Sequence, residues 1–205
     1  MADPYVYPGT KILINKEGIR NKAELDQFER VMTAVRLREG IPEAALTTDG
    51  YRAIHRHVFQ DVFSWAGEFR TAEISKGGHL FCRPRYLRSE MDKRFQMIGA
   101  EAPWDGVAAD EFARRLAGHV SELNAIHPFR EGNGRTMRAF IDIAARRAGQ
   151  DLHVERIEPG PWIQASIRSF KTGDATGLER VIRGIYGPRL AEPARDGFGK
   201  RRDPG

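Results

Sequence analysis

The chain has 205 residues, a formal net charge of +5 at pH 7 and a sequence pI of about 9.5. With 40% hydrophobic and 30% charged residues and no apolar run near the roughly 18 residues of a membrane span, it is typical of one soluble globular domain. The single cysteine, Cys82, excludes an internal disulfide framework and any multi-thiolate zinc site.

The N-terminal half begins with a segment that lacks the basic stretch and apolar core of a secretory signal, so we expect a cytoplasmic protein. From Asn21 the sequence NKAE resembles a capping box and predicts a helix that ends before Gly40 and Pro42. A second helix is predicted from about Thr48. The residues expected in the core from these two segments are Leu25, Phe28, Met32, Val35, Tyr51, Ile54, Val58 and Val62.

A hairpin is predicted in the stretch FRTAEISKGGHLFCRP, residues 69–84. Gly77 and Gly78 separate two short runs, RTAEIS and HLFCR, that are typical of strands joined by a tight turn. Because nothing else in the chain predicts a sheet, and two strands alone are marginal in water, this hairpin is expected to keep a free edge.

The C-terminal half is predicted to be helical. Apolar spacing indicates helices over 87–98, from about Asp105 to 126, from about 135 to 148, from Pro159 or Pro161, and from Asp174. Pro128 ends the second of these and pushes His127 out of helical conformation. Residues 187–205 are rich in Gly, Pro and charge, so we expect a disordered tail after a single domain spanning 1–186.

The most informative stretch is HPFREGNGRTMR, residues 127–138. Gly132, Asn133 and Gly134 precede a helix, so their amides and the helix dipole predict an anion site. Arg135 and Arg138 are three residues apart on that helix and can bind more than one phosphate. The stretch lacks the lysine and Ser/Thr of a Walker loop and the preceding strand of a Rossmann turn.

Two further residues of this stretch carry ionisable groups suited to catalysis. Glu131 is placed to hold Mg²⁺ together with phosphate oxygens, although it could instead cap the following helix. His127 has an ordinary pKa near 6.5, so it is mostly neutral at pH 7 and can accept a proton from an attacking hydroxyl. Together they predict phosphoryl or nucleotidyl transfer from a magnesium-bound nucleoside triphosphate.

HPFREGNGRTMR resembles the Fic-family signature HPFx[D/E]GNGRxxR at every fixed position. The resemblance extends to YPGT at Tyr7, FSWAGEFR from Phe63 and ISKGGHLFCRP from Ile74, and so covers about residues 7–186. It is strongest to small bacterial Fic toxins and to the Fic domains of Bartonella-type effectors. It implies a mainly α fold, a Fic-type helical bundle with one β-hairpin flap, and transfer of AMP from ATP to a protein hydroxyl with release of pyrophosphate.

The resemblance also implies a role for each motif residue. His127 would be the general base, Glu131 the Mg²⁺ ligand, and Asn133 with the amides of Gly132 and Gly134 the α-phosphate binder. Arg135 would hold the α- and β-phosphates and Arg138 the γ-phosphate.

The flap and one apolar motif residue have implied roles as well. The flap, about Thr71–Phe81, would pair its free edge with an extended target segment, with Ile74 and Lys76 as contacts. Phe129 would be buried in the core beneath the loop.

The resemblance raises the question of how the enzyme is restrained. In the family, a helix with the pattern [S/T]xxxE[G/N] places a glutamate against the second motif arginine. Here the three EG candidates have no Ser or Thr at the required position, which is occupied by Leu13, Val35 and His127. We therefore expect a separate small antitoxin that supplies the helix in trans, and toxicity without it.

The target and the broader class leave alternatives open. The small toxins suggest DNA gyrase and topoisomerase IV as targets, and the effectors suggest host GTPases instead. Kinase or phosphocholine transfer is disfavoured by the intact GNGRTMR. A catalytically idle nucleotide-binding module, or a basic nucleic-acid adaptor, is the binding-class alternative; an adaptor would lose affinity steeply with salt and need no ATP. Direct nucleic-acid or membrane binding is not expected.

Other chemistry-bearing residues are interpreted more simply. His55 and His57 are two apart and point in different directions on a helix, so they make a poor metal pair. His79 and Cys82 lack further ligands, and no metal other than magnesium is expected. Trp162 is interpreted as core rather than as part of an adenine pocket.

Overall fold

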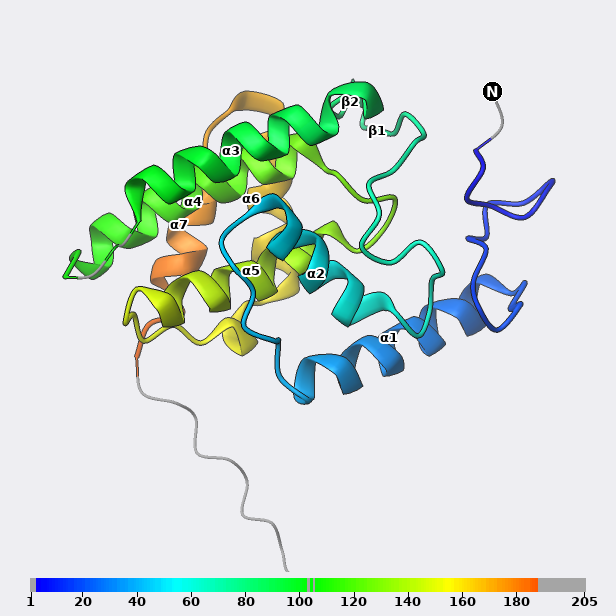
Figure 1. Cartoon of the computed structure of the whole chain (residues 1–205), viewed down its shortest axis with the longest axis horizontal. Helices are drawn as coiled ribbons and strands as arrows, with labels where there is room; N and C mark the ends of the chain where they lie inside the picture. The colour runs from blue at the N-terminus through cyan, green and yellow to red at the C-terminus, as the bar shows by residue number, and fades with distance from the viewer. Residues whose placement is uncertain (1–2, 103, 105, 188–205) are drawn as a thin grey trace, which may run out of the picture.

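The computed structural model describes residues 3–102, 104 and 106–187. Within these residues it contains seven α-helices, two single-turn 3₁₀ helices and one two-stranded sheet, which confirms the mainly α fold with one hairpin (Figure 1). The α-helices are α1 Lys22–Arg38, α2 Thr48–Phe59, α3 Leu87–Glu101, α4 Ala109–Ile126, α5 Asn133–Arg147, α6 Pro159–Thr172 and α7 Thr176–Arg183. The 3₁₀ turns are Pro84–Tyr86 and Val154–Arg156, and the strands are β1 Ser75–Lys76 and β2 His79–Leu80.

Helix α4 lies at the centre of the main core. It packs against α3, α5, α6 and α7, and α3 runs along it in Figure 1. Four residues at helical spacing on α4 are fully buried: Phe112, Leu116, Val120 and Leu123. Burying such side chains stabilises the fold by about 1.5–3 kcal/mol each, so α4 is firmly held in the core up to the turn before His127.

A second, smaller core joins the N-terminal helix to the rest. It consists of Leu25, Val58, Phe59, Val62, Phe63 and Ala66. Asn21 caps α1 as predicted, because its side chain accepts hydrogen bonds from the amides of Ala23 and Glu24. Through this core α1 lies beside α2, and α2 in turn packs against α5.

Several predicted boundaries and burials are wrong in detail. Helix α4 begins at Ala109 rather than near Asp105, and α7 begins at Thr176, since Asp174 instead accepts hydrogen bonds from Thr176. Val35 was expected in the core but is 42% exposed, because α1 covers only one edge of the bundle. Val62 is buried as expected, although it lies beyond the end of α2.

The hairpin is present but much shorter than the two predicted runs. Ser75 pairs with Leu80 and Lys76 with His79, and Gly77 and Gly78 form the turn with φ of 58° and 80°. Beyond the strands one further backbone hydrogen bond joins the Phe81 amide to the Ile74 carbonyl, and then the backbone groups bind elsewhere: the amide of Arg70 donates to Pro128 and that of Cys82 to Ala125. The stems of the hairpin are therefore attached to the end of α4 and the motif.

Two remaining expectations concern the ends of the chain and the membrane. The expected tail, 187–205, lies outside the described residues except for Gly187. No helix in the described ranges combines the length and the apolar character needed to cross a bilayer.

Candidate active site

His127 follows the last residue of α4 and adopts a left-handed conformation, with φ 50° and ψ 63°. It is the only non-glycine residue with positive φ in the part of the chain that the structure describes. Pro128 disfavours helical conformation in the preceding residue, which accounts for the end of α4 here. Nδ1 of His127 lies 3.2 Å from the backbone oxygen of Asn124. Because a carbonyl oxygen can only accept, Nδ1 carries the proton and Nε2 is the free ring nitrogen.

The surroundings of His127 keep its imidazole neutral. Burial lowers its pKa to about 4, and the positive charges of Arg70 and Lys76 act in the same direction. Its ring stacks on Phe81, with ring centroids 4.0 Å apart. At pH 7 the side chain is therefore unprotonated at Nε2, which is the form that a general base requires.

The loop before α5 forms the expected helix N-terminus. Gly132 has φ 84°, and a Cβ at this position would lie 2.3 Å from the ring of Phe59, so only glycine fits. The first helical hydrogen bond runs from the Thr136 amide to the Gly132 oxygen. No side chain caps this helix, so the amides of residues 133–135 have no partner among the described residues. These amides and the helix dipole form a site for an anion.

Asn133 fixes the shape of this loop. Its side-chain oxygen accepts from the Phe129 amide at 3.0 Å, and its Nδ2 donates to the Phe129 oxygen at 2.8 Å. Phe129 is fully buried, as predicted. The buried Phe129 side chain anchors the loop in the core, and the Asn133 side-chain amide holds the loop backbone at Phe129.

Glu131 presents one carboxylate at the edge of the loop. Its side chain is 44% exposed, and Oε1 accepts from the Gly132 amide at 2.8 Å and lies 3.6 Å from Nη2 of Arg135. Glu131 does not cap α5, because Gly132 is the residue before the helix and its amide is not one of the free helical amides. No group of three His, Cys, Asp or Glu side chains lies together in the described ranges. A single accessible carboxylate beside an anion site nevertheless fits Mg²⁺, which often binds one carboxylate plus phosphate oxygens and water.

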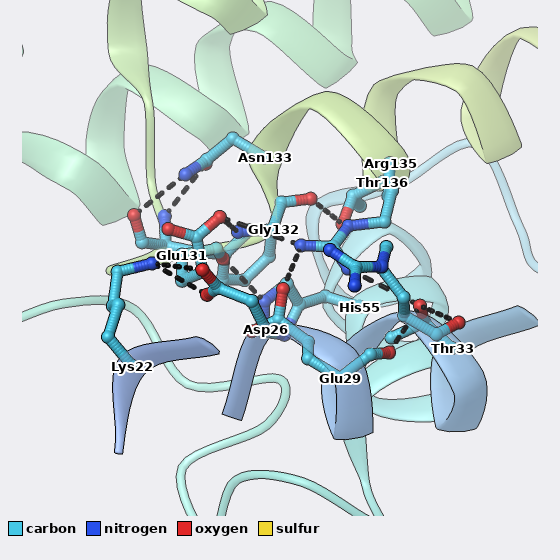
Figure 2. Close-up of polar contacts among 12 residues, drawn as sticks. Lys22, Asp26, Glu29, Thr33, His55, Glu131, Gly132, Asn133, Arg135 and Thr136 are labelled. Atoms are coloured by element: carbon cyan, nitrogen blue, oxygen red, sulfur yellow. Dashed lines mark hydrogen bonds and ion pairs between the residues drawn. The ribbon is translucent and has the colours of Figure 1, made fainter. Parts of the chain in front are cut away.

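Arg135 extends toward α1 rather than toward His127. Its guanidinium donates to Glu29, makes a 3.3 Å hydrogen bond with Thr33 and lies 4.6 Å from the centre of the Phe59 ring. Figure 2 shows this group between α1 and the motif loop. Burial raises the pKa of Glu29, although the charge of Arg135 opposes that effect.

Arg138 is partly buried and has no ion pair with any described residue. Burial lowers its pKa, and the neighbouring charge of Arg135 does so too. Both arginines line a cavity of about 430 Å³ together with Leu37 and Ile41. An arginine without a carboxylate in a partly apolar cavity is suited to bind an anionic group.

A second cavity, of about 250 Å³, contains the other predicted site residues. Among the residues that line it are His127, Glu131, Gly132, Asn133, Gly134 and Lys76. The structure therefore brings together the base, the carboxylate and the anion loop. It places Arg135 and Arg138 on a neighbouring cavity, with their helix between the two.

The flap residues are placed as follows. Lys76 is exposed and lines the His127 cavity. Ile74 is partly buried and lines neither cavity; its carbonyl accepts from the Phe81 amide at 3.2 Å. In the described chain β1 pairs only with β2, so its other edge is free.

Sequence reasoning missed several residues of this site. Trp162, interpreted as core, is 5% exposed and also lines the His127 cavity, as does Ser166. Their spacing of four on α6 could have placed both on one face. Phe81 stacks on His127, but nothing in the sequence indicates that contact.

A neutral histidine and an uncapped helix N-terminus in one cavity provide a proton acceptor beside an anion site, which suits an enzyme that transfers a phosphate-containing group. The chain belongs to the Fic/DOC family, whose model matches residues 45–145. Within that family it is a nucleotidyltransferase of the protein adenylyltransferase kind.

Relatives of known description support this assignment. The chain is 43% identical over 187 residues to the probable protein adenylyltransferase y4lH of Sinorhizobium fredii, covering 89% of this chain and 95% of the relative. It is 36% identical to the probable protein adenylyltransferase Fic of Escherichia coli, with 88% and 90% covered. It is also 36% identical to the protein adenylyltransferase VbhT of Bartonella schoenbuchensis. That match covers 88% of this chain but 38% of the relative.

Solved structures share the fold. The BepC effector protein of Bartonella tribocorum superposes with a TM-score of 0.82 at 23% identity, covering 91% of this chain and 97% of that one. A Fic domain from Bartonella quintana with bound ADP has a TM-score of 0.81 at 26% identity, with 90% and 95% covered.

Proposed function

We propose that the chain transfers AMP from ATP to a hydroxyl side chain of a target protein with His127 as the general base. The observation that carries this proposal is the cavity of about 250 Å³ that joins His127 to the amides at the start of α5. The free Nε2 and the anion site are thus available to one bound nucleotide.

The chemical step follows from this arrangement. The acceptor hydroxyl gives its proton to Nε2 of His127 while its oxygen forms a bond to the α-phosphorus of ATP. The bond from that phosphorus to the oxygen bridging the β-phosphate breaks, and pyrophosphate leaves. Asn133 with the amides of Gly132 and Gly134 is proposed to bind the α-phosphate as negative charge develops. Arg135 is proposed to hold the α- and β-phosphates and Arg138 the γ-phosphate, from the neighbouring cavity that both arginines line.

Magnesium is proposed as the cofactor, and Glu131 is the residue that would hold it. A bound Mg²⁺ withdraws charge from phosphate oxygens and so stabilises the leaving pyrophosphate. The partly exposed carboxylate of Glu131 lines the same cavity as His127, which suits this role.

The target is proposed to bind the flap by β-augmentation, adding a strand at the free edge of β1. Lys76 both belongs to β1 and lines the His127 cavity, so a segment paired there would place its side chain near Nε2. Ile74 and Lys76 are the proposed contacts.

A small antitoxin is proposed to restrain the enzyme by occupying the cavity beside Arg138. Three arginines and two carboxylates line this cavity beside its apolar residues, and Arg138 forms no ion pair with any described residue. A helix with one glutamate and an apolar face would complement it. The proposed place of action is the bacterial cytoplasm, with gyrase or topoisomerase IV as the target.

An effector role on host GTPases is the second candidate function. It is supported by the names of the solved neighbours, which are VirB-translocated Bartonella effector proteins.

The test compares the wild type with His127→Ala in a bacterial lysate supplied with ATP labelled on the α- or the γ-phosphate. His57→Ala is the matched control, because His57 contacts the Arg36 carbonyl on α1 and lines neither cavity. We expect α-label on a discrete band, dependent on Mg²⁺, lost in His127→Ala and retained in His57→Ala.

Other outcomes would identify the alternatives. γ-Label on the band would mean a kinase. Labelling in a host-cell lysate but not in the bacterial one would favour the effector role. No labelling in either lysate, together with salt-sensitive binding to nucleic acid without ATP, would contradict the proposed function and support the adaptor.

A further inference from the structure

Arg70 is a buried arginine without a carboxylate partner. It is 2% exposed and forms no salt bridge with any Asp or Glu among the described residues. Its guanidinium donates instead to backbone carbonyls, at 2.9 Å to His127, 2.8 Å to Ala72, 3.4 Å to Ile126, and also to Cys82. A buried charge is costly unless it is paired or fully hydrogen-bonded, so this set of four acceptors requires an explanation.

The four acceptors belong to three segments that meet at the site. Ile126 and His127 form the C-terminal end of α4, where the carbonyls and the helix dipole favour a cation. Ala72 precedes β1 and Cys82 follows β2, so they are the two stems of the flap. The Arg70 amide adds a fifth hydrogen bond, because it donates to the Pro128 carbonyl at 2.9 Å.

This arrangement couples the flap to the catalytic histidine. The His127 ring is held by Asn124 and by stacking on Phe81, which directly follows β2. The His127 backbone and the flap stems are held relative to each other by the one guanidinium. We infer that Arg70 is a positioning residue that fixes the flap, and with it the bound target, in register with Nε2 of His127. The inference rests on the proposed function.

Only arginine can make this set of contacts. The guanidinium has five N–H donors in a rigid planar fork, and here Nε, Nη1 and Nη2 are all used. A lysine ammonium has three donors at one point and cannot reach carbonyls on opposite sides of the group. Arg70→Lys therefore keeps the positive charge but cannot form all four hydrogen bonds of the guanidinium.

The first experiment measures amide hydrogen exchange in Arg70→Lys and in the control Arg94→Lys. Arg94 pairs with Glu122 between α3 and α4, with a side chain 17% exposed, and contacts neither flap nor motif. We expect exchange at the Phe81 and Cys82 amides to become about tenfold faster in Arg70→Lys only, as local opening of the flap becomes easier. Unchanged exchange there would overturn the inference.

The second experiment measures AMP transfer to lysate protein as a function of ATP concentration. The anion loop does not contact Arg70, so Arg70→Lys should lower the maximal rate about 10- to 100-fold with less than about a twofold change in the apparent KM for ATP. A loss that appears only in KM, or equally in Arg94→Lys, would overturn the positioning role.

The two experiments separate the inference from the proposed function. If the wild type transfers no AMP, the proposed function fails, whereas hydrogen exchange still reports whether Arg70 holds the flap. If Arg70→Lys does not fold, as judged by circular dichroism, Arg70→Gln takes its place, because it retains an N–H donor and buries no unpaired charge. The same exchange and rate criteria then apply.

Discussion

At the scale of single residues, the proposed role of His127 as general base predicts how transfer depends on pH. Its pKa is lowered from 6.5 to about 4, chiefly by burial, so the base is available throughout the neutral range. We expect a maximal rate that is constant from about pH 6 to about pH 8 and falls as the pH approaches about 4. The measurement is the initial rate at saturating ATP across this range. An inflection near the ordinary value of 6.5 would contradict the effect of burial.

Gly132 is the residue at which the loop tolerates no side chain. It has φ 84°, and an added Cβ would lie 2.3 Å from Phe59. Gly149 also has positive φ, at 62°, but has open space around it. We expect Gly132→Ala to lower the free energy of unfolding by about 2 to 4 kcal/mol and Gly149→Ala by about 1 to 2 kcal/mol, since only the first combines backbone strain with overpacking. Urea unfolding of both variants measures the difference, and equal losses would show that Phe59 moves aside.

At the scale of elements, α1 supplies a carboxylate partner to Arg135 of α5, the residue proposed to bind phosphate. Glu29 on α1 binds this guanidinium and is itself only 13% exposed. Because its carboxylate repels a polyphosphate, Glu29→Gln should lower the Kd for ATP about three- to tenfold at low salt. Glu24→Gln, an exposed substitution on the same helix, is the control. Calorimetry measures both, and weaker binding in Glu29→Gln would mean that Glu29 instead orients Arg135 for phosphate.

The same elements show what the sequence can and cannot predict. The helix, loop and helix around residues 127–138 follow from local signals: Pro128 ends α4, and Gly132 with Asn133 begins α5. The hairpin turn at Gly77 is also local and was predicted. The strand lengths were not, because the amides of the stems bind the end of α4, a contact with residues more than 40 positions away.

Contacts between distant segments also account for what was missed in the site. Glu29 and Arg135 are 106 residues apart, and Arg70 and His127 are 57 apart. Neither pair has a spacing that any helical or strand period would bring together. The motif therefore predicts which groups carry the chemistry, whereas only the fold shows which groups hold them.

At the scale of the whole molecule, three histidines with lowered pKa values connect stability to pH. Burial is the main cause that lowers the pKa of His55 to about 3, of His127 to about 4, and of His119 below its ordinary value. His55 is fully buried, accepts from the Gly67 amide at Nδ1, and therefore donates from Nε2 to the Glu131 carbonyl. Protonation at Nδ1 would break the hydrogen bond from the Gly67 amide and place an unpaired charge beneath the motif loop.

The free energy of unfolding should therefore decrease as the pH falls. Below about 6.5 the unfolded chain binds protons at these histidines while the folded chain does not, so the stability present above that pH is lost progressively, by up to about 1.4 kcal/mol per pH unit for each histidine. Urea unfolding between about pH 7 and about pH 5 measures the slope, above the range in which ordinary carboxylates titrate. His55→Gln removes one titrating group, so the free energy of unfolding should depend less steeply on pH. The Gln amide can still donate to the Glu131 carbonyl, but the buried imidazole is lost, so the variant should be less stable at pH 7. Equal slopes in the wild type and His55→Gln would show that His55 becomes protonated within the folded protein.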